Sequence, residues 1–195
     1  MDDPGNGFTP VDRDDLAGLI PHVTTQSELN EVEAANILDA RVRAVSDRGL
    51  RRTLLTPRAL CRLHRMMFDR VWTWAGRFRT RDPNIGSDWE MIPDEVAQLC
   101  ADVRAWLEYR TYDWPTRAVR FHHRLVRIHP FPNGNGRHAR LAADLLLHYN
   151  GRAMLNWAID RSAYISALQS AEDHDYRPLL ELIRPLGTTT RGDQT

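Results

Sequence analysis

The segment from Gly136 to Gly151, GRHARLAADLLLHYNG, is apolar on almost every side of a predicted helix. Its apolar residues include Leu141, Ala142, Leu145 and Leu146. A helix with so little polar surface is stable only when other elements cover it. We therefore expect this segment to be the central buried helix, ending near Gly151, with the rest of the chain packed around it.

Apolar residues recur at helical spacing in most other parts of the chain. These patterns predict helices within residues 25–46, 56–76, 93–110, 114–128, 160–173 and 175–186. In the first pattern Leu38 and Val42 belong to the apolar set, so we expect an amphipathic helix there. Thr56 followed by Pro57 is a typical helix start. The fold class predicted is all-α.

Residues 77–93, RFRTRDPNIGSDWEMIP, interrupt the helical pattern. Asp82, Pro83, Asn84 and Gly86 favour turns, and the flanking residues alternate weakly between polar and apolar. We predict a short extended excursion, a small β-hairpin, between two helices. A loop of this kind in a helical chain often carries function.

The length of 195 residues and a hydrophobic content of 42% fit a single domain, residues 1–195. We expect an ordered core at about residues 9–186 and a flexible C-terminal tail at 187–195. Basic and acidic residues balance at 26 each, which argues against a nucleic-acid partner. No apolar run is long enough to span a bilayer, and the acidic, polar N-terminus is unlike a secretory signal. We expect a cytoplasmic protein that does not bind membranes.

The chain contains no lysine, so all its basic residues are arginines. A Walker A phosphate site needs a lysine, and so does catalysis through a Schiff base. Both mechanisms are excluded. Any phosphate would be bound by arginine side chains and backbone N–H groups.

The segment HPFPNGNGRHAR, residues 129–140, connects two predicted helices. Pro130 and Pro132 disfavour helical backbone at the residue before each, so we expect extended conformations at His129 and Phe131. Phe131 is expected to enter the core and to hold the adjacent backbone in place. His129 would then have a defined position, and histidine accepts protons readily near neutral pH.

Gly134 and Gly136, on either side of Asn135, permit backbone angles that let consecutive N–H groups converge at a helix start. Such a concave nest binds phosphate. Arg137 and Arg140 share one face of the following helix and can contact the same anion. The combination favours phosphoryl or nucleotidyl transfer.

Each of these elements also has an ordinary structural explanation. A Gly-Asn-Gly sequence is frequently only the turn before a helix, and a histidine beside proline is frequently a surface or packing residue. Arg140 can simply pair with Asp144, one helical turn later. It is their order within twelve residues that favours a phosphate site.

At these residues the sequence resembles the Fic family (Fic/DOC-type protein adenylyltransferases), whose signature reads HxFx[DE]GNGRxxR. The matching residues are His129, Phe131, Gly134, Asn135, Gly136, Arg137 and Arg140. The resemblance extends to LHRMMFDRVWTWAGRFR, similar to the family's approach helix, and NIGSDWEMIP, similar to its flap. Coverage runs from about Thr9 to Leu186, and the most similar group is the Fic proteins called mobile mystery protein B.

The resemblance implies a Fic-type helical bundle that transfers AMP from ATP to a Tyr, Thr or Ser hydroxyl of a target protein, as a nucleotidyltransferase. His129 would be the general base. The phosphate-binding residues implied are Gly134, Asn135, Gly136, Arg137 and Arg140, with Arg137 on the terminal phosphates. Ile85 and Gly86 of the flap would pair with the target's backbone as an added strand.

Asn133 departs from the family signature, which has Asp or Glu at the position of its metal ligand. A neutral amide offers Mg²⁺ no charge, so Mg²⁺ binding is expected to be weakened. Activity would then be attenuated, redirected or lost. The alternatives are a nucleotide-binding or protein-interaction module and an enzyme that transfers a different phosphate-containing group.

Many Fic proteins block their own ATP site with a helix that carries [ST]xxxE[GN]. The nearest match is SELNEV, with Ser27, Glu31 and then Val32 where Gly or Asn is expected. Glu31, on the predicted helix 25–46, is thus a candidate inhibitory residue, and the alternative is a solvated glutamate. A regulatory partner protein is a further implication of the resemblance.

Overall fold

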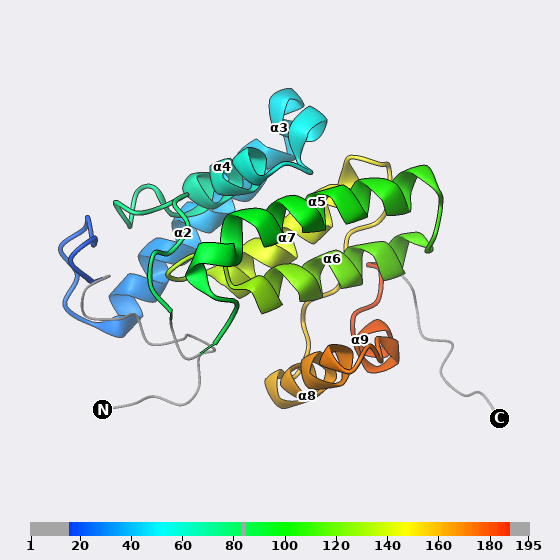
Figure 1. Ribbon diagram of the computed structural model, residues 1–195. Coiled ribbons are helices and arrows are strands. Elements are labelled where there is room, and N and C mark those ends of the chain that lie inside the picture. Colours follow the sequence, from blue (N-terminus) through cyan, green and yellow to red (C-terminus); the bar gives the residue numbers. More distant parts are fainter. Residues whose placement is uncertain (1–15, 83–84, 188–195) are drawn as a thin grey trace.

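The computed structural model describes residues 16–82 and 85–187, whose regular structure is helical (Figure 1). The elements are α2 Gln26–Ser46, α3 Arg48–Thr53, α4 Pro57–Phe68, the 3₁₀ turn η1 Trp89–Met91, α5 Ile92–Glu108, α6 Trp114–Ile128, α7 Asn135–His148, α8 Arg161–Glu172 and α9 Arg177–Leu182. Within these ranges β-pairing is limited to two isolated bridges, Leu19 with Trp72 and Leu155 with Pro185. The all-α prediction is confirmed.

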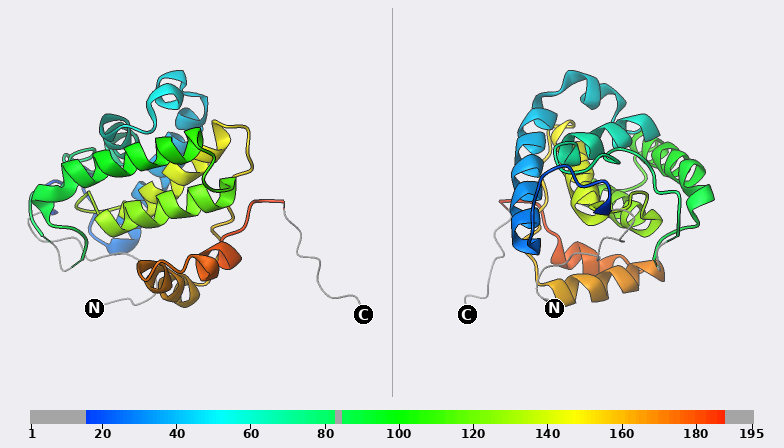
Figure 2. Two further views of the ribbon diagram at one scale, coloured as in Figure 1. Left: turned by 45° about the vertical axis from the view of Figure 1, so that its right-hand side comes forward. Right: turned by 90° about the vertical axis from the view of Figure 1, so that its left-hand side faces the viewer.

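Helix α7 is the predicted central helix, and Leu141, Ala142, Leu145 and Leu146 are all buried. It packs against α6, α4 and α2. In the end-on view of Figure 2, α7 lies inside the other helices, with α2 and α4 on one side, α5 and α6 on the other, and α8 and α9 below. The helix ends at His148, close to the predicted stop at Gly151.

The expected inward face of α2 is only partly correct. Leu38 and Val42 are 65% and 66% exposed, whereas Glu33 and Asn36 are buried. Polar groups on the neighbouring elements cause this rotation, because they need hydrogen-bond partners: Asn36 donates Nδ2–H to the Met66 carbonyl at 3.2 Å. α2 is therefore held as much by polar contacts as by apolar packing.

The helix starts follow the capping signals in the sequence. Thr56 caps α4 through the Ala59 N–H, and Pro57 occupies the first turn, as predicted. Asp113 caps α6 in the same manner. Thr25 and Glu28 form a reciprocal capping box at the start of α2. These caps fix the directions of the helices that surround α7.

Two apolar clusters lie on opposite sides of α6 and α7. The larger one packs these helices against α2, α4 and α5, and the smaller one packs them against α8 and α9. Buried histidines accompany the smaller cluster: His122 bonds Tyr164 at 2.7 Å, and His123 bonds Tyr176 at 3.1 Å. The α8–α9 layer is thus attached through both aromatic packing and hydrogen bonds.

The predicted β-hairpin is wrong for the described residues of segment 77–93. This part of the chain contains bends followed by η1, and none of its described residues is in a strand. The reason is that a buried arginine, Arg79, binds carbonyl oxygens in this segment and in the loop after α6, in place of a ladder between two strands. The segment is called the flap below.

The predicted core limit at residue 9 lies outside the described residues, and so does the predicted tail except for Gly187. Among the helices that the structure describes, none is both long and apolar enough to cross a membrane. Cys61 and Cys100 are free thiols whose pKa burial raises to about 11.

Candidate functional site

The loop between α6 and α7 is fixed by Phe131 and Asn135. Phe131 is fully buried, as predicted, and stacks on His64 with ring centroids 3.8 Å apart. The Asn135 side chain accepts the Phe131 N–H at 2.9 Å and donates to the Phe131 carbonyl at 2.7 Å. The side chain of Asn135 therefore closes the loop and leaves only its backbone N–H for a ligand.

His64 on α4 also holds this loop, and sequence reasoning missed it. The Gly76 N–H donates to His64 Nδ1 at 3.0 Å, so the ring proton is on Nε2, which donates to the Asn133 carbonyl at 3.0 Å. Burial is the main cause that lowers the pKa of His64 well below its ordinary value, followed by the nearby His138. The signal available was a histidine within the apolar stripe of a helix.

His129 follows α6 directly and adopts left-handed backbone, with φ 53° and ψ 56°. The prediction of extended backbone at His129 is therefore wrong, because its N–H still bonds the Leu125 carbonyl and the chain reverses there. A non-glycine residue in this region costs about 1–3 kcal/mol and persists only where neighbours hold it.

Arg79 is the neighbour that holds His129 in this conformation. The buried Arg79 side chain donates Nε–H to the His129 carbonyl at 2.8 Å, and the Arg79 backbone N–H donates to the Pro130 carbonyl at 2.9 Å. Its other nitrogens bind Asp82 Oδ1 and the Ser87 carbonyl in the flap. One guanidinium thus joins the flap to the loop, a contact that no local pattern indicated.

The imidazole of His129 is kept neutral. Burial, and after it the charge of Arg79, lowers the pKa of His129 to about 4, whereas a bond to the Val126 carbonyl acts in the opposite direction. At neutral pH the ring therefore has an unprotonated nitrogen that can accept a proton.

Gly86 of the flap packs directly on His129. A Cβ at Gly86 would lie 2.6 Å from the His129 Cβ, and the φ of Gly86 is +97°, so a side chain is excluded on two grounds. Ile85 beside it is 48% exposed. The structure therefore brings Gly86 next to the predicted base, with the exposed Ile85 preceding it in the flap.

The start of α7 has no side-chain cap. Gly134 precedes the helix with φ +77°, where a Cβ would collide with the Phe68 ring, and it offers the helix no side-chain cap. Gly136 is helical, contrary to the special backbone angles expected for it, and a Cβ there would meet open space. Uncapped N–H groups at a helix start attract anions.

Arg137 is paired with a carboxylate from α2. Its Nη1 lies 2.7 Å from Glu33 Oε2, and the Glu33 side chain is 1% exposed. Glu33 also accepts the Trp72 Nε1–H at 2.7 Å and an N–H of Asn133 at 3.4 Å. The positive charge of Arg137 is therefore neutralised within the protein.

Arg140 lies in a different environment, between the rings of Tyr164 and Trp157, with centroid distances of 5.1 and 5.9 Å. No carboxylate of the described residues pairs with it. The alternative of a pair with Asp144 is not observed, since Asp144 accepts from the Leu155 N–H and the Trp157 Nε1–H. The positive charge of Arg140 is therefore not compensated by a carboxylate of the described residues.

The residues around Asn133 do not fit a magnesium site. Asn133 Oδ1 accepts the Gly134 N–H at 2.7 Å, and its Nδ2 is directed at Glu33. The described residues contain no group of three or more His, Cys, Asp or Glu side chains that could hold a metal ion. A hard cation needs several free oxygens, so we assign no step to a protein-bound Mg²⁺.

The structure places Glu31 and Glu33 differently, although they are two residues apart on α2. Glu31 is exposed, and Glu33 is the one that contacts the motif. The sequence signal for Glu33 was a carboxylate on the face of α2 that also carries Leu29 and Asn36.

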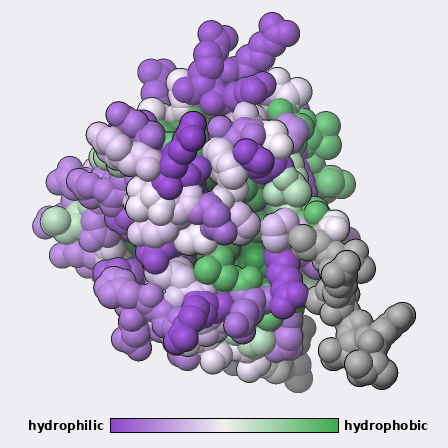
Figure 3. All heavy atoms as spheres, turned by 90° about the vertical axis from the view of Figure 1, so that its right-hand side faces the viewer, coloured by the Kyte–Doolittle hydropathy of each residue, from purple (hydrophilic) through white to green (hydrophobic). Residues whose placement is uncertain are grey.

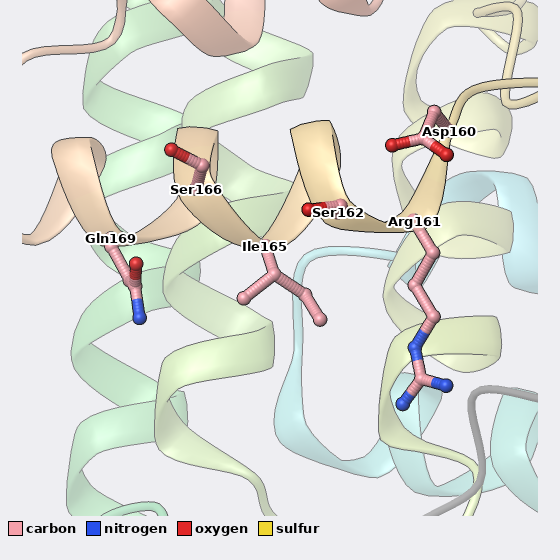
Figure 4. Close-up of a pocket in the computed structure, with 6 residues that line it drawn as sticks. All are labelled: Asp160, Arg161, Ser162, Ile165, Ser166 and Gln169. Carbon is pink, nitrogen blue, oxygen red and sulfur yellow. The ribbon is translucent and has the colours of Figure 1, made fainter. Parts of the chain in front are cut away.

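A surface groove of about 490 Å³ runs along α8 (Figure 4). Its described lining residues are Asp160, Arg161, Ser162, Ile165, Ser166 and Gln169. In Figure 4 the side chains of Arg161, Ile165 and Gln169 project from the same edge of the helix. Tyr164, which contacts both Arg140 and His122, lies on the buried face of α8 and does not line this groove.

Comparison with known proteins agrees with this geometry. The model of the Fic/DOC family matches residues 54–147, which include α4, the flap and the loop after α6. Residues 54–147 form a Fic/DOC domain. The Fic/DOC match includes every motif residue predicted above except Glu31, which precedes it.

Curated relatives carry the Fic name, and solved structures share the fold. Protein adenylyltransferase fic-1 of Caenorhabditis elegans is 33% identical over 113 residues, 56% of this chain and 22% of that protein. The Fic domain of a VirB-translocated Bep effector protein from Bartonella quintana, with bound ADP, superposes with a TM-score of 0.68 at 17% identity, covering 86% of this chain and 90% of that one. BepC from Bartonella tribocorum, with bound AMPPNP, gives 0.65 at 15% identity, with 84% and 90% covered.

The matches to curated relatives span 22–30% of the length of those proteins. The solved structures share less than 25% sequence identity with this chain, and the comparison shows that they and this chain have the same fold.

Proposed function

We propose that this protein is a Fic-type protein adenylyltransferase, which transfers AMP from ATP to a hydroxyl group of a target protein. The observation that carries the proposal is the neutral His129, held against the flap and followed six residues later by the uncapped start of α7. Relatives of this Fic/DOC domain named protein adenylyltransferases support it.

In the proposed reaction His129 is the general base. The target's Tyr, Thr or Ser oxygen forms a bond to the α-phosphorus of ATP, the bond to the bridging oxygen breaks, and pyrophosphate leaves. His129 accepts the hydroxyl proton. With the pKa of His129 lowered to about 4, the neutral ring is present throughout the neutral range, and activity is expected to fall only in acid.

The phosphates of ATP would bind at the start of α7. The N–H groups of Asn135 and Gly136 supply donors at the positive end of the helix dipole. Arg140 is the motif arginine that adds uncompensated charge, whereas Arg137 would reach the terminal phosphates only by leaving Glu33.

The flap is proposed to position the target. Its described backbone is not paired with another strand, and Ile85 is exposed. An extended segment of the target can therefore add to the flap as a strand. The contact of Gly86 with His129 would bring a hydroxyl on that segment close to the base.

The test compares ATP labelled on the α-phosphate with ATP labelled on the γ-phosphate, in a lysate that supplies candidate targets. Transfer of α-label to protein, reduced by a factor of about 10²–10⁴ in His129→Ala, is the expected result. His148→Ala, which changes an exposed histidine on α7, serves as the matched control and should transfer label normally. Label only from the γ-phosphate, or equal transfer by wild type and His129→Ala, would overturn the proposal.

The second candidate is a module that binds nucleotide without catalysis. The hydrogen bond from Asn133 to Glu33 favours this candidate, because it occupies the side chain at the position where the family signature has a metal ligand. In that case calorimetry would detect ATP binding that is independent of Mg²⁺, and neither label would be transferred.

A further inference from the structure

A second pocket lies at the opposite end of α7 from the motif loop. It has a volume of about 310 Å³ and is formed by α3, the connection from α3 to α4, α5 and the end of α7. The 14 residues of α7 place it about 20 Å from the loop. Its lining residues are Arg51, Arg52, Thr53, Leu54, Leu55, Thr56, Arg104, Leu107, Leu146, Tyr149 and Asn150.

The rim of this pocket is strongly basic. Three arginines line it, and none of the lining residues is acidic. Within the described chain, none of Arg51, Arg52 and Arg104 forms an ion pair with a carboxylate. Asp47, the carboxylate close to Tyr149, is already bound to Arg62 at 2.5 Å. The rim therefore has positive charge that is not compensated inside the protein.

Neighbouring groups hold part of the rim in place. Arg104 donates Nη1–H to the Leu55 carbonyl, and Arg52 donates Nε–H to the Arg48 carbonyl at 3.2 Å. Each guanidinium keeps further N–H groups for a ligand. Guanidinium groups held in this manner bind phosphate oxygens with two parallel hydrogen bonds.

The floor of the pocket is apolar, unlike its rim. Leu54, Leu55, Leu107 and Leu146 contribute side chains beside the Tyr149 ring. Figure 3 looks onto this end of the molecule: hydrophilic side chains rise at the top, where α3 lies in Figure 1, above a small hydrophobic area. An inorganic anion would leave this floor uncovered, whereas a ligand with an apolar body would cover it.

We propose that this pocket binds a small organic phosphate, with its phosphate on Arg51, Arg52 and Arg104 and its apolar body on the leucine floor. The site is independent of the proposed adenylyl transfer, because it shares no lining residue with the motif. Hydrogen bonds between two charged groups are about twice as strong as neutral ones, so the arginines should dominate the affinity.

In the test, the full chain is titrated separately with phenyl phosphate, inorganic phosphate and benzyl alcohol. Calorimetry measures the affinity for each compound, and amide NMR identifies the residues that are affected. Phenyl phosphate should bind about tenfold more tightly than either comparison compound, since each lacks one of the two recognised parts. In the wild type, the shifted NMR signals should be those of residues 51–56 and the Asn150 side chain.

The double variant Arg51→Ala/Arg52→Ala should weaken phenyl phosphate by about tenfold or more, with an unchanged melting temperature because both side chains are exposed. Arg58→Ala is the matched control: it removes an exposed arginine of α4 that does not line the pocket. Equal weakening in both variants, no binding of phenyl phosphate, or shifts confined to Gly134–Gly136 would overturn the proposal.

Discussion

Arg137 and Arg140 lie three residues apart on α7, yet their surroundings are opposite. Arg137 meets a buried carboxylate that arrives from α2, near the start of the chain. Arg140 meets the rings of Trp157 and Tyr164, which arrive from the later part of the chain. A motif that places two equal charges on one helix face has therefore produced one arginine that is paired with a carboxylate and one that is not.

The difference shows that the motif alone does not decide which arginine is available to an anion. Glu33 satisfies Arg137 with a charged hydrogen bond, whereas an aromatic ring offers Arg140 an attraction that an incoming phosphate can easily exceed. Each arginine also has a buried histidine close to it, His64 near Arg137 and His122 near Arg140. The following predictions test the two environments.

Lowering the pH should destabilise the surroundings of both arginines, and this is the largest change in unfolding free energy that we expect. Burial, followed by the charge of Arg140, lowers the pKa of His122 to about 3. Between pH 6.5 and 4 the unfolded chain binds a proton at this histidine and the folded chain does not, so the free energy of unfolding falls as the pH falls. His122 alone should contribute about 3 kcal/mol of this loss, and buried His64 adds to it.

Denaturant unfolding at pH 7 and pH 4.5 measures this loss. His122→Gln, which keeps a polar group near Tyr164, should flatten the pH dependence, whereas His148→Gln on the exposed side of α7 should not. A flat stability profile in the wild type would contradict the neutral state of these histidines.

Removing the Glu33 carboxylate should destabilise the surroundings of Arg137 and leave those of Arg140 unchanged. Glu33→Ala leaves Arg137, Trp72 and Asn133 without their shared acceptor, and the loss expected for a broken buried pair is about 3 kcal/mol of unfolding free energy. Glu31→Ala is the matched control on the same helix and should change stability by less than about 0.5 kcal/mol. If the two variants are equally stable, Glu33 does not have the role that the geometry gives it.

Asn133→Asp should also destabilise the Arg137 side, because a second carboxylate would face Glu33 in a buried position. We expect a loss of about 2 kcal/mol in chemical denaturation. The double variant Glu33→Gln/Asn133→Asp exchanges the amide and the carboxylate and should recover at least half of the loss in a double-mutant cycle. An Asn133→Asp protein with unchanged stability and higher transfer activity would instead indicate that a metal ligand had been restored.

The smallest effect on stability is expected at Arg140. Arg140→Met retains the apolar stem between the rings and loses a cation–π attraction of about 1 kcal/mol. Its affinity for ATP, measured by calorimetry, should nevertheless fall more than that of Arg137→Met, because only Arg140 offers uncompensated charge. The reverse order would mean that Glu33 releases Arg137 when nucleotide binds.

The sequence was sufficient for the elements whose causes are local. Apolar spacing predicted α7, and Thr56 followed by Pro57 predicted the start of α4, since these features depend on residues within one turn. The motif also identified His129, Gly134 and the two arginines as a group. Their roles as base and phosphate ligands stay predictions.

What the sequence could not predict depends on partners that are distant along the chain. Arg79 binds the His129 carbonyl across 50 positions, and Glu33 binds Arg137 across 104. The left-handed backbone of His129 follows from the first contact, and the burial of Glu33 in preference to Leu38 follows from the second. Neither partner can be inferred from residues nearby in the sequence, although the face of α2 that carries Leu29 and Asn36 also carries Glu33.

The contact between Glu33 and Arg137 also has a consequence for synthesis. α2 leaves the ribosome early, but its carboxylate has no arginine partner until α7 has emerged, about 100 residues later. At roughly 5–20 residues per second, that interval lasts many seconds. A nascent chain that ends before α7 therefore has Glu33 but neither its arginine partner nor the start of α7.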